Sequence, residues 1–460
     1  MFDNIPKEVH MLQFLEREQT VAGPGFSRWL VPPAALSIHL AIGQVYAFSV
    51  FNLPMTRLLG ITRSAPNDWR LTDLGWIFSF AILFLGLSAA FGGKWVERAG
   101  PRKAMLASAL CFSGGFLVAA LGVAMHDIAI VYVGYGVLGG VGLGLGYVSP
   151  VKTLITWFPD RPGMATGMAI MGFGGGAMIG SPLAVALMGH FQSATSAGVW
   201  QTFVTMGLIY LAFMMLGVVT VRVPPEGWMP EGYSAPARPQ RLVTTGNVSA
   251  DNAIRTRQFY LLWFVLFLNV TAGIGVLGQA SPMIQEMFKG RISVAAAGGF
   301  VGLLSLFNMA GRFLWSSASD YLGRKPTYAI YFALGAALYA LTPTTGRIGS
   351  VVLFVGAYAV IMSMYGGGFA TIPAYLRDIF GTDQVSAIHG RLLTAWSAAG
   401  LAGPVLVNYI RQYQVGHGVP PAQAYSITMY LMAGLLVLGF VSNQLITAVE
   451  ARFQTHRVAA

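Results

Sequence analysis

Long apolar segments separated by short polar loops run along the whole chain. Twelve such segments can be recognised, and most reach the roughly 20 residues that a helix needs to cross a bilayer. They cover residues 29–56, 72–93, 104–125, 129–155, 163–190, 199–221, 258–286, 294–318, 327–343, 350–374, 388–411 and 423–447. Backbone groups in lipid must be satisfied within the protein, and no segment alternates like a barrel strand. The pattern therefore predicts an all-α membrane protein with twelve transmembrane helices.

A proline-rich stretch interrupts this rhythm at residues 222–257 and separates six apolar segments from six. Five prolines among scattered polar residues are typical of a flexible linker. The predicted organisation is a cytoplasmic N-terminal segment (1–28), a six-helix bundle (29–221), a cytoplasmic linker (222–257), a second six-helix bundle (258–447) and a cytoplasmic tail (448–460).

The two predicted bundles repeat one another. A charged turn follows the second apolar segment at residues 93–103, and a similar turn follows the eighth at residues 316–325. Glu97 and Asp320, and likewise Gly100 and Gly323, are offset by 223 residues. A constant offset indicates two parallel six-helix repeats, a plan that recurs among transporters.

Composition agrees with a membrane protein. The chain is 55% hydrophobic and only 10% charged, whereas a soluble domain carries about 25% charged residues. Its net charge of +11 is spread over loops rather than gathered in an aromatic-rich patch, so we expect no nucleic-acid partner. Residues 1–28 do not resemble a signal peptide, and the single Cys111 excludes an internal disulfide.

The basic residues predict the orientation. With the N-terminus inside, nineteen of the 28 Lys and Arg fall on the cytoplasmic side and seven on the other. Positive charge stays on the cytoplasmic side during insertion. We therefore expect a multi-pass protein of the cytoplasmic membrane with both termini in the cytoplasm.

Arg312 is the main candidate for chemistry. It lies eight residues before Asp320, about 12 Å along a helix and well inside the bilayer, where a charge costs at least about 2.5–3.5 kcal/mol. The amide of Asn308, one turn earlier, can orient the guanidinium without cancelling its charge. A planar cation of this kind suits a carboxylate, although a structural pairing with Asp320 is the alternative. The residue 223 positions earlier is Ala89, so the charge is absent from the other repeat.

These features resemble the major facilitator superfamily over the whole chain. The segments Ile42-Gly-Gln-Val-Tyr-Ala-Phe48 and Asn308-Met-Ala-Gly-Arg312 resemble its oxalate–formate antiporter branch and the monocarboxylate transporters. The resemblance implies alternating access to a cavity in which Arg312 holds a small organic anion. Three positions differ: Asn308 replaces an aspartate and Val50 a lysine of the proton-coupled carriers, and Trp396 falls near the second cation of the oxalate carrier.

Other side chains have a functional and a packing interpretation. The resemblance implies that tyrosines from helices 1, 4 and 10 line the substrate cavity and that Trp396 forms a wall of this cavity. His39 is the candidate proton carrier because its side chain titrates near neutrality, and Lys152 could attract anions or simply reach the interface. The charged turns are candidates for gating. The complete set is Arg312, Asn308, Tyr46, Tyr147, Tyr365 and Trp396 for substrate, His39 for protons, Lys152 for anion attraction, and Glu97, Arg98, Arg102, Asp320, Arg324 and Lys325 for gating.

We therefore expect a secondary transporter of a small carboxylate, resembling carriers of monocarboxylates, oxalate or formate, that works by exchange or by proton symport. We expect it to act as a monomer in a lipid bilayer, with no cofactor and no metal. An exporter of hydrophobic or cationic compounds is the nearer alternative, but it would need a buried acid away from the helix ends. A membrane sensor or enzyme is the more distant alternative.

Overall fold

The computed structural model describes residues 13–233, 242–244, 246–277 and 280–455. Lys7, Arg238, Arg241 and Arg457, which entered the charge count, lie outside the described residues. The chain forms two compact units, of which the first comprises Met1–Ala237 with Gln384–Leu393 and the second Arg238–Asp383 with Thr394–Ala460. The short segment 384–393 therefore belongs to the first unit, although the sequence places it in the second bundle.

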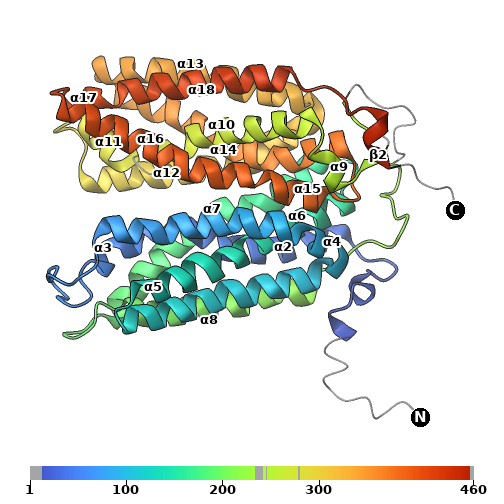
Figure 1. Ribbon diagram of the computed structural model, residues 1–460, viewed down its shortest axis with the longest axis horizontal. Helices are drawn as coiled ribbons and strands as arrows, with labels where there is room; N and C mark the ends of the chain where they lie inside the picture. The colour runs from blue at the N-terminus through green and yellow to red at the C-terminus, as the bar shows by residue number, and fades with distance from the viewer. Residues whose placement is uncertain (1–12, 234–241, 245, 278–279, 456–460) are drawn as a thin grey trace, which may run out of the picture. The chain divides into compact units, whose positions relative to one another are not determined.

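The first unit is a bundle of long helices that run alongside one another (Figure 1). Its first apolar segment is α-helical only to Ile42 and continues as a 3-10 helix to Phe51. The elements are η1 (Glu18–Thr20), η2 (Arg28–Leu30), α2 (Val31–Ile42), η3 (Gly43–Phe51), α3 (Asn52–Met55), α4 (Leu71–Ala124), α5 (Ile128–Val131), the π-helix η4 (Tyr132–Gly139), α6 (Gly140–Trp157), α7 (Pro162–Phe191), α8 (Val199–Thr220) and α15 (Val385–Leu392).

The second unit is also helical, with one two-stranded antiparallel pair. Its elements are β1 (Asn247–Val248), α9 (Ala250–Ala253), α10 (Arg257–Leu277), α11 (Ala280–Met287), α12 (Val294–Leu322), α13 (Arg324–Arg347), α14 (Val351–Phe380), α16 (Thr394–Gly416), α17 (Pro421–Ala424), α18 (Ser426–Gln444), η5 (Ala451–Phe453) and β2 (Gln454–Thr455). The end of the predicted linker is thus folded, because β1 pairs with β2 and Ser249 caps α9 by accepting from Asn252 N.

Nine helices within the described residues are long and apolar enough to cross a membrane. One of them, α4, consists of two helices that meet at Gly100. The long helices α12 and α13 complete the set of twelve. The predicted all-α fold with twelve transmembrane helices in two six-helix repeats is confirmed.

Two equivalent glycines allow the chain to turn at the charged turns. Gly100 has φ 80° and ψ 169° between the two halves of α4, and Gly323 has φ 85° and ψ 153° between α12 and α13. A side chain at such a positive φ would be strained, so both repeats need glycine at this point. The shared backbone geometry explains why the spacing of 223 residues is visible in the sequence.

Glycines also let α6 approach both halves of α4. A Cβ atom at Gly142 would lie 2.4 Å from Phe112 N, and one at Gly144 would lie 2.3 Å from Leu85 O. These distances leave no room for a methyl group, so the helix backbones are in direct contact. Close approach through small residues is how membrane helices pack without a hydrophobic driving force.

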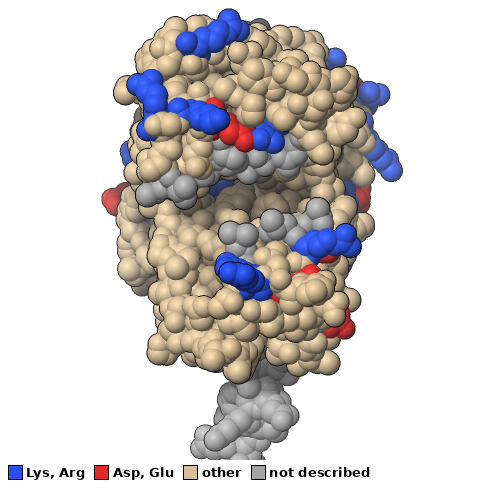
Figure 2. Space-filling view, turned by 90° about the vertical axis from the view of Figure 1, so that its left-hand side faces the viewer, with Lys and Arg blue, Asp and Glu red and all other residues tan. Residues whose placement is uncertain are grey.

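The outer surfaces of both units carry large exposed apolar side chains, including Leu110, Leu314 and Val352. On the face shown in Figure 2, uncharged side chains cover most of the surface, and Lys and Arg occur in small groups, some beside Asp or Glu. Extensive exposed apolar surface is expected where lipid replaces water.

The loop before α4 is organised around one carboxylate. Asp68 accepts hydrogen bonds from the amides of Leu59 (2.8 Å), Ala65 (2.8 Å) and Gly60 (3.2 Å). Burial would raise the pKa of Asp68, but these amides and the nearby His126 together hold it below the usual range. The ionised side chain therefore stabilises this loop.

Candidate functional site

Arg312 lies in the middle of α12 and is fully buried. Its Nε donates to Asn308 Oδ1 at 3.1 Å, and its guanidinium carbon lies 5.2 Å from the ring centre of Phe369. Asn308 is one helical turn before Arg312 and is also buried. The predicted orientation of the guanidinium by Asn308 is therefore present in the structure.

Asp320, the alternative partner of Arg312, takes part in another ion pair. Its carboxylate accepts from Arg324 Nη2 at 2.6 Å, and Arg324 Nε also donates to Asp378 at 3.1 Å. Lys325 Nζ donates to the carbonyls of Gln444 (2.7 Å) and Ile446 (2.9 Å). The second charged turn thus connects α12 to α14 and to the end of α18.

A cluster of buried aromatic rings lies beside the Arg312 side chain in the second unit, with Phe369 in contact with it. Phe369 follows Tyr365 by one turn of α14, and their ring centres are 5.3 Å apart. The ring of Trp396, from α16, lies 4.5 Å from that of Phe369. The structure therefore brings together three predicted residues, Arg312, Tyr365 and Trp396, around Phe369. The sequence analysis did not single out Phe369, because one more phenylalanine in an apolar helix carries no signal of its own.

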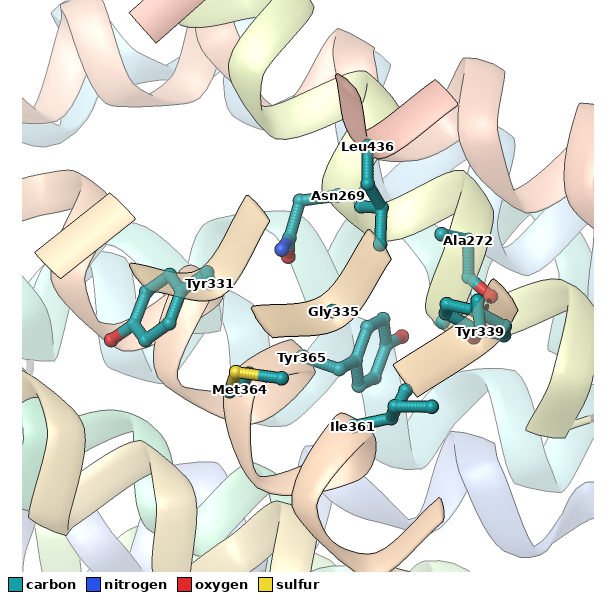
Figure 3. A pocket seen from close by; sticks show the side chains of 10 residues that line it. Asn269, Ala272, Tyr331, Gly335, Tyr339, Ile361, Met364, Tyr365 and Leu436 are labelled. Atoms are coloured by element: carbon teal, nitrogen blue, oxygen red, sulfur yellow. Dashed lines mark hydrogen bonds between the residues drawn. The ribbon is translucent and has the colours of Figure 1, made fainter. Parts of the chain in front are cut away.

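Tyr365 also borders a small cavity between α10, α13, α14 and α18 (Figure 3). A Cβ atom at Gly273 would lie 2.0 Å from the Tyr365 ring, so glycine at this position makes room for that ring. The side-chain oxygen of the buried Asn269 faces this region without a hydrogen-bond partner among the described residues. The cavity has space for about one water molecule, which such an oxygen would bind.

In the first unit, two predicted tyrosines contact Phe173 of α7. The ring of Tyr147, from α6, lies 5.5 Å from the Phe173 ring, and that of Tyr46, from η3, lies 5.1 Å from it. Tyr147 also contacts His39 of α2 and His389 of α15, with ring centres 5.4 and 5.8 Å apart. His389 was not predicted, because its neighbours come from distant parts of the chain.

Glu97 of the first charged turn has partners on two other helices. Its carboxylate forms an ion pair with Lys152 of α6 and accepts from Ser386 N of α15 at 2.9 Å. Lys152, which the sequence predicts to attract anions or to reach the interface, is thus the ion-pair partner of Glu97. Glu97 thus holds the beginning of α15 against α4.

The basic residues of the first charged turn contact the N-terminal segment. Arg102 is buried and donates to the carbonyls of Phe14, Gln19, Val218 and Val221. Lys103 pairs with Glu16 at 2.8 Å, and Arg98 is exposed. Among the described residues, no group of three or more His, Cys, Asp or Glu could hold a metal ion.

Sequence comparisons agree with this architecture. The family model of the Major Facilitator Superfamily matches residues 34–404. The chain is 27% identical over 384 residues to the oxalate:formate antiporter of Oxalobacter formigenes, covering 82% of this chain and 83% of that protein. It is 25% identical to the apicoplast pyruvate carrier 1 of Toxoplasma gondii (76% and 72% covered) and 23% identical to the human monocarboxylate transporter 11 (85% and 79% covered).

Solved structures share the fold at lower identity. The Escherichia coli fucose:proton symporter FucP superposes with a TM-score of 0.63 at 13% identity, covering 91% of this chain and 99% of that one. The proton:xylose symporter XylE gives 0.64 at 16% identity, with 90% and 94% covered. The match of the family model over most of the chain, with twelve helices in two repeats, shows that this multi-pass membrane transporter belongs to the Major Facilitator Superfamily.

Proposed function

We propose that the protein carries a small carboxylate across the cytoplasmic membrane by alternating access, as a monomer with both termini in the cytoplasm. The observation that carries the proposal is the fully buried Arg312, oriented by a neutral amide. Asn308 orients the guanidinium, and its neutral amide adds no charge of its own. A carboxylate can pair with the guanidinium through two parallel hydrogen bonds, which this planar group is shaped to donate.

The surroundings favour a small substrate. Phe369 and Trp396 are completely buried and pack against each other beside Arg312. Such a wall of rings excludes water, which strengthens an ion pair, and it limits the length of a bound anion. Three similar proteins are named for oxalate and formate, pyruvate, and monocarboxylates, and this supports the same class of substrate here.

An exporter of cations would need a buried acid that is free to bind them. The largely buried carboxylates of Asp320 and Asp378 are both paired with Arg324. Both acids therefore already have a cationic partner. This favours the anion carrier over the exporter of hydrophobic or cationic compounds.

The test is uptake of radiolabelled formate, oxalate, lactate and pyruvate into proteoliposomes. We expect Arg312→Ala to abolish uptake of the transported anion and Arg312→Lys to retain a small part, because lysine keeps the charge but not the two-pronged geometry. Arg347→Ala, which removes an exposed arginine of the same unit, is the matched control. Normal carboxylate uptake by Arg312→Ala would refute the assignment, and export of cations without carboxylate uptake would favour the alternative.

A further inference from the structure

A buried histidine of α2 lies between two carbonyl oxygens. His39 is completely buried, its Nδ1 contacts Ala169 O of α7, and its Nε2 lies 3.2 Å from Tyr147 O of α6. A carbonyl oxygen only accepts hydrogen bonds, and a neutral imidazole has a single N–H to donate. The neutral ring can therefore satisfy one of these contacts, whereas the imidazolium donates to both. The geometry suits the protonated form.

A second buried histidine also contacts Tyr147. His389 of α15 is 1% exposed, and its ring centre is 5.8 Å from that of Tyr147. Its Nε2 has no hydrogen-bond partner among the described residues. Because a buried polar atom is normally paired, an unsatisfied ring nitrogen calls for an explanation. A nitrogen that accepts and releases a proton during a transport cycle would provide one.

Several charged side chains lie on the helices that carry or contact the two histidines. Glu97 of α4 is held by Lys152 of α6 and by the backbone of α15. Further titratable or charged side chains on these helices are Lys94 on α4, Arg391 on α15 and Tyr210 on α8, whose hydroxyl donates to Gln44. Two imidazolium rings beside the same tyrosine would repel each other. The pair of histidines is therefore suited to at most one proton at a time.

We propose that His39 and His389, which both contact the ring of Tyr147, form the proton-binding site of this transporter and couple carboxylate movement to protons. The proposal rests on the proposed function. A proton from water binds the lone pair of a neutral imidazole, the carboxylate binds at Arg312, and both leave on the other side of the membrane. No covalent bond of the carboxylate forms or breaks. One proton moving with one monocarboxylate makes the step electroneutral.

His39→Gln and His389→Gln test the proposal in proteoliposomes, with His190→Gln, an exposed histidine of α7, as the matched control. Two rates are measured for each protein: accumulation of the carboxylate driven by a pH gradient, and exchange of labelled for unlabelled carboxylate at equal pH. We expect the two buried variants to lose the acceleration by the pH gradient, while His190→Gln keeps it. A pH gradient that still drives accumulation in both buried variants would overturn the proposal.

The wild-type protein separates this proposal from the proposed function. If it transports no carboxylate under either condition, the proposed function fails. If it exchanges carboxylate but a trapped pH dye reports no proton entry with it, the proton site alone is overturned. Should neither buried variant reach the membrane in folded form, this dye measurement decides the question: proton entry that accompanies the carboxylate supports the proposal.

Discussion

Replacing Gly366 with alanine would place a methyl group inside the contact between α14 and α12. Its Cβ atom would lie 2.1 Å from Asn308 O and 2.6 Å from Asn308 Oδ1, whereas ordinary contact begins at 3.4 Å. The two helices must therefore move apart by roughly 1.3 Å, because a helix carbonyl cannot turn aside like a flexible side chain. The displaced residue is the hydrogen-bond partner of Arg312.

We expect two measurable consequences of Gly366→Ala. Overpacking lowers the free energy of unfolding by about 1–3 kcal/mol, which thermal unfolding in detergent would detect. Moving a positioning group by about 1 Å can reduce a rate by about 100-fold, so carboxylate transport should fall well below the wild-type rate. Gly302→Ala is the control, since a Cβ atom at that position of α12, the helix that Gly366 contacts, would meet open space. Wild-type stability and transport in Gly366→Ala would refute the reasoning.

Two further predictions concern the first unit. A Cβ atom at Gly390 would lie 2.0 Å from Ala89 O, so Gly390→Ala should push α15 away from α4. A cysteine introduced at Ser386 should then be alkylated faster than in the protein with Gly390. An unchanged alkylation rate would contradict this contact. The pKa of Asp68 is lowered in the folded protein, so its ionised carboxylate stabilises the fold. This stabilisation should be fully present above the ordinary aspartate pKa and should be lost as the pH falls through the pKa that Asp68 has in the folded protein. Thermal unfolding across that acidic range should show this loss in the wild type and not in Asp68→Asn, and identical pH profiles would contradict it.

The fold could be predicted because its signals are local or repeated. Each membrane helix is visible as a long apolar segment, and the two repeats share glycines that the backbone requires at Gly100 and Gly323. The assignment of α15 to the first unit could not be predicted in this way. Residues 385–416 form one apolar stretch, and nothing in its pattern shows that the part before Leu393 packs with the first unit.

The candidate site could be predicted only in part, because some of its contacts join residues that are distant in the sequence. Arg312 and Asn308 are one turn apart on a single helix, so their contact follows from spacing. Phe369 and His389 gain their importance from rings on other helices, and the sequence contains no short-range trace of those contacts. A charge in an apolar helix is conspicuous, whereas a ring or a buried imidazole is ordinary until its neighbours are known.

The repeats also explain why Arg312, rather than a charged turn, distinguishes the second unit. Ala89, Gly93 and Glu97 are spaced by four on α4, and this face holds α15 through Gly390, the backbone of Ala387 and the amide of Ser386. The equivalent positions on α12 are Arg312, Ser316 and Asp320. Ala89 is completely buried and its carbonyl lies against Gly390 of α15, so an arginine at position 89 would overpack this contact. The same helix face thus packs a helix in one unit and carries a buried cation in the other, so the charge is not needed to build the fold.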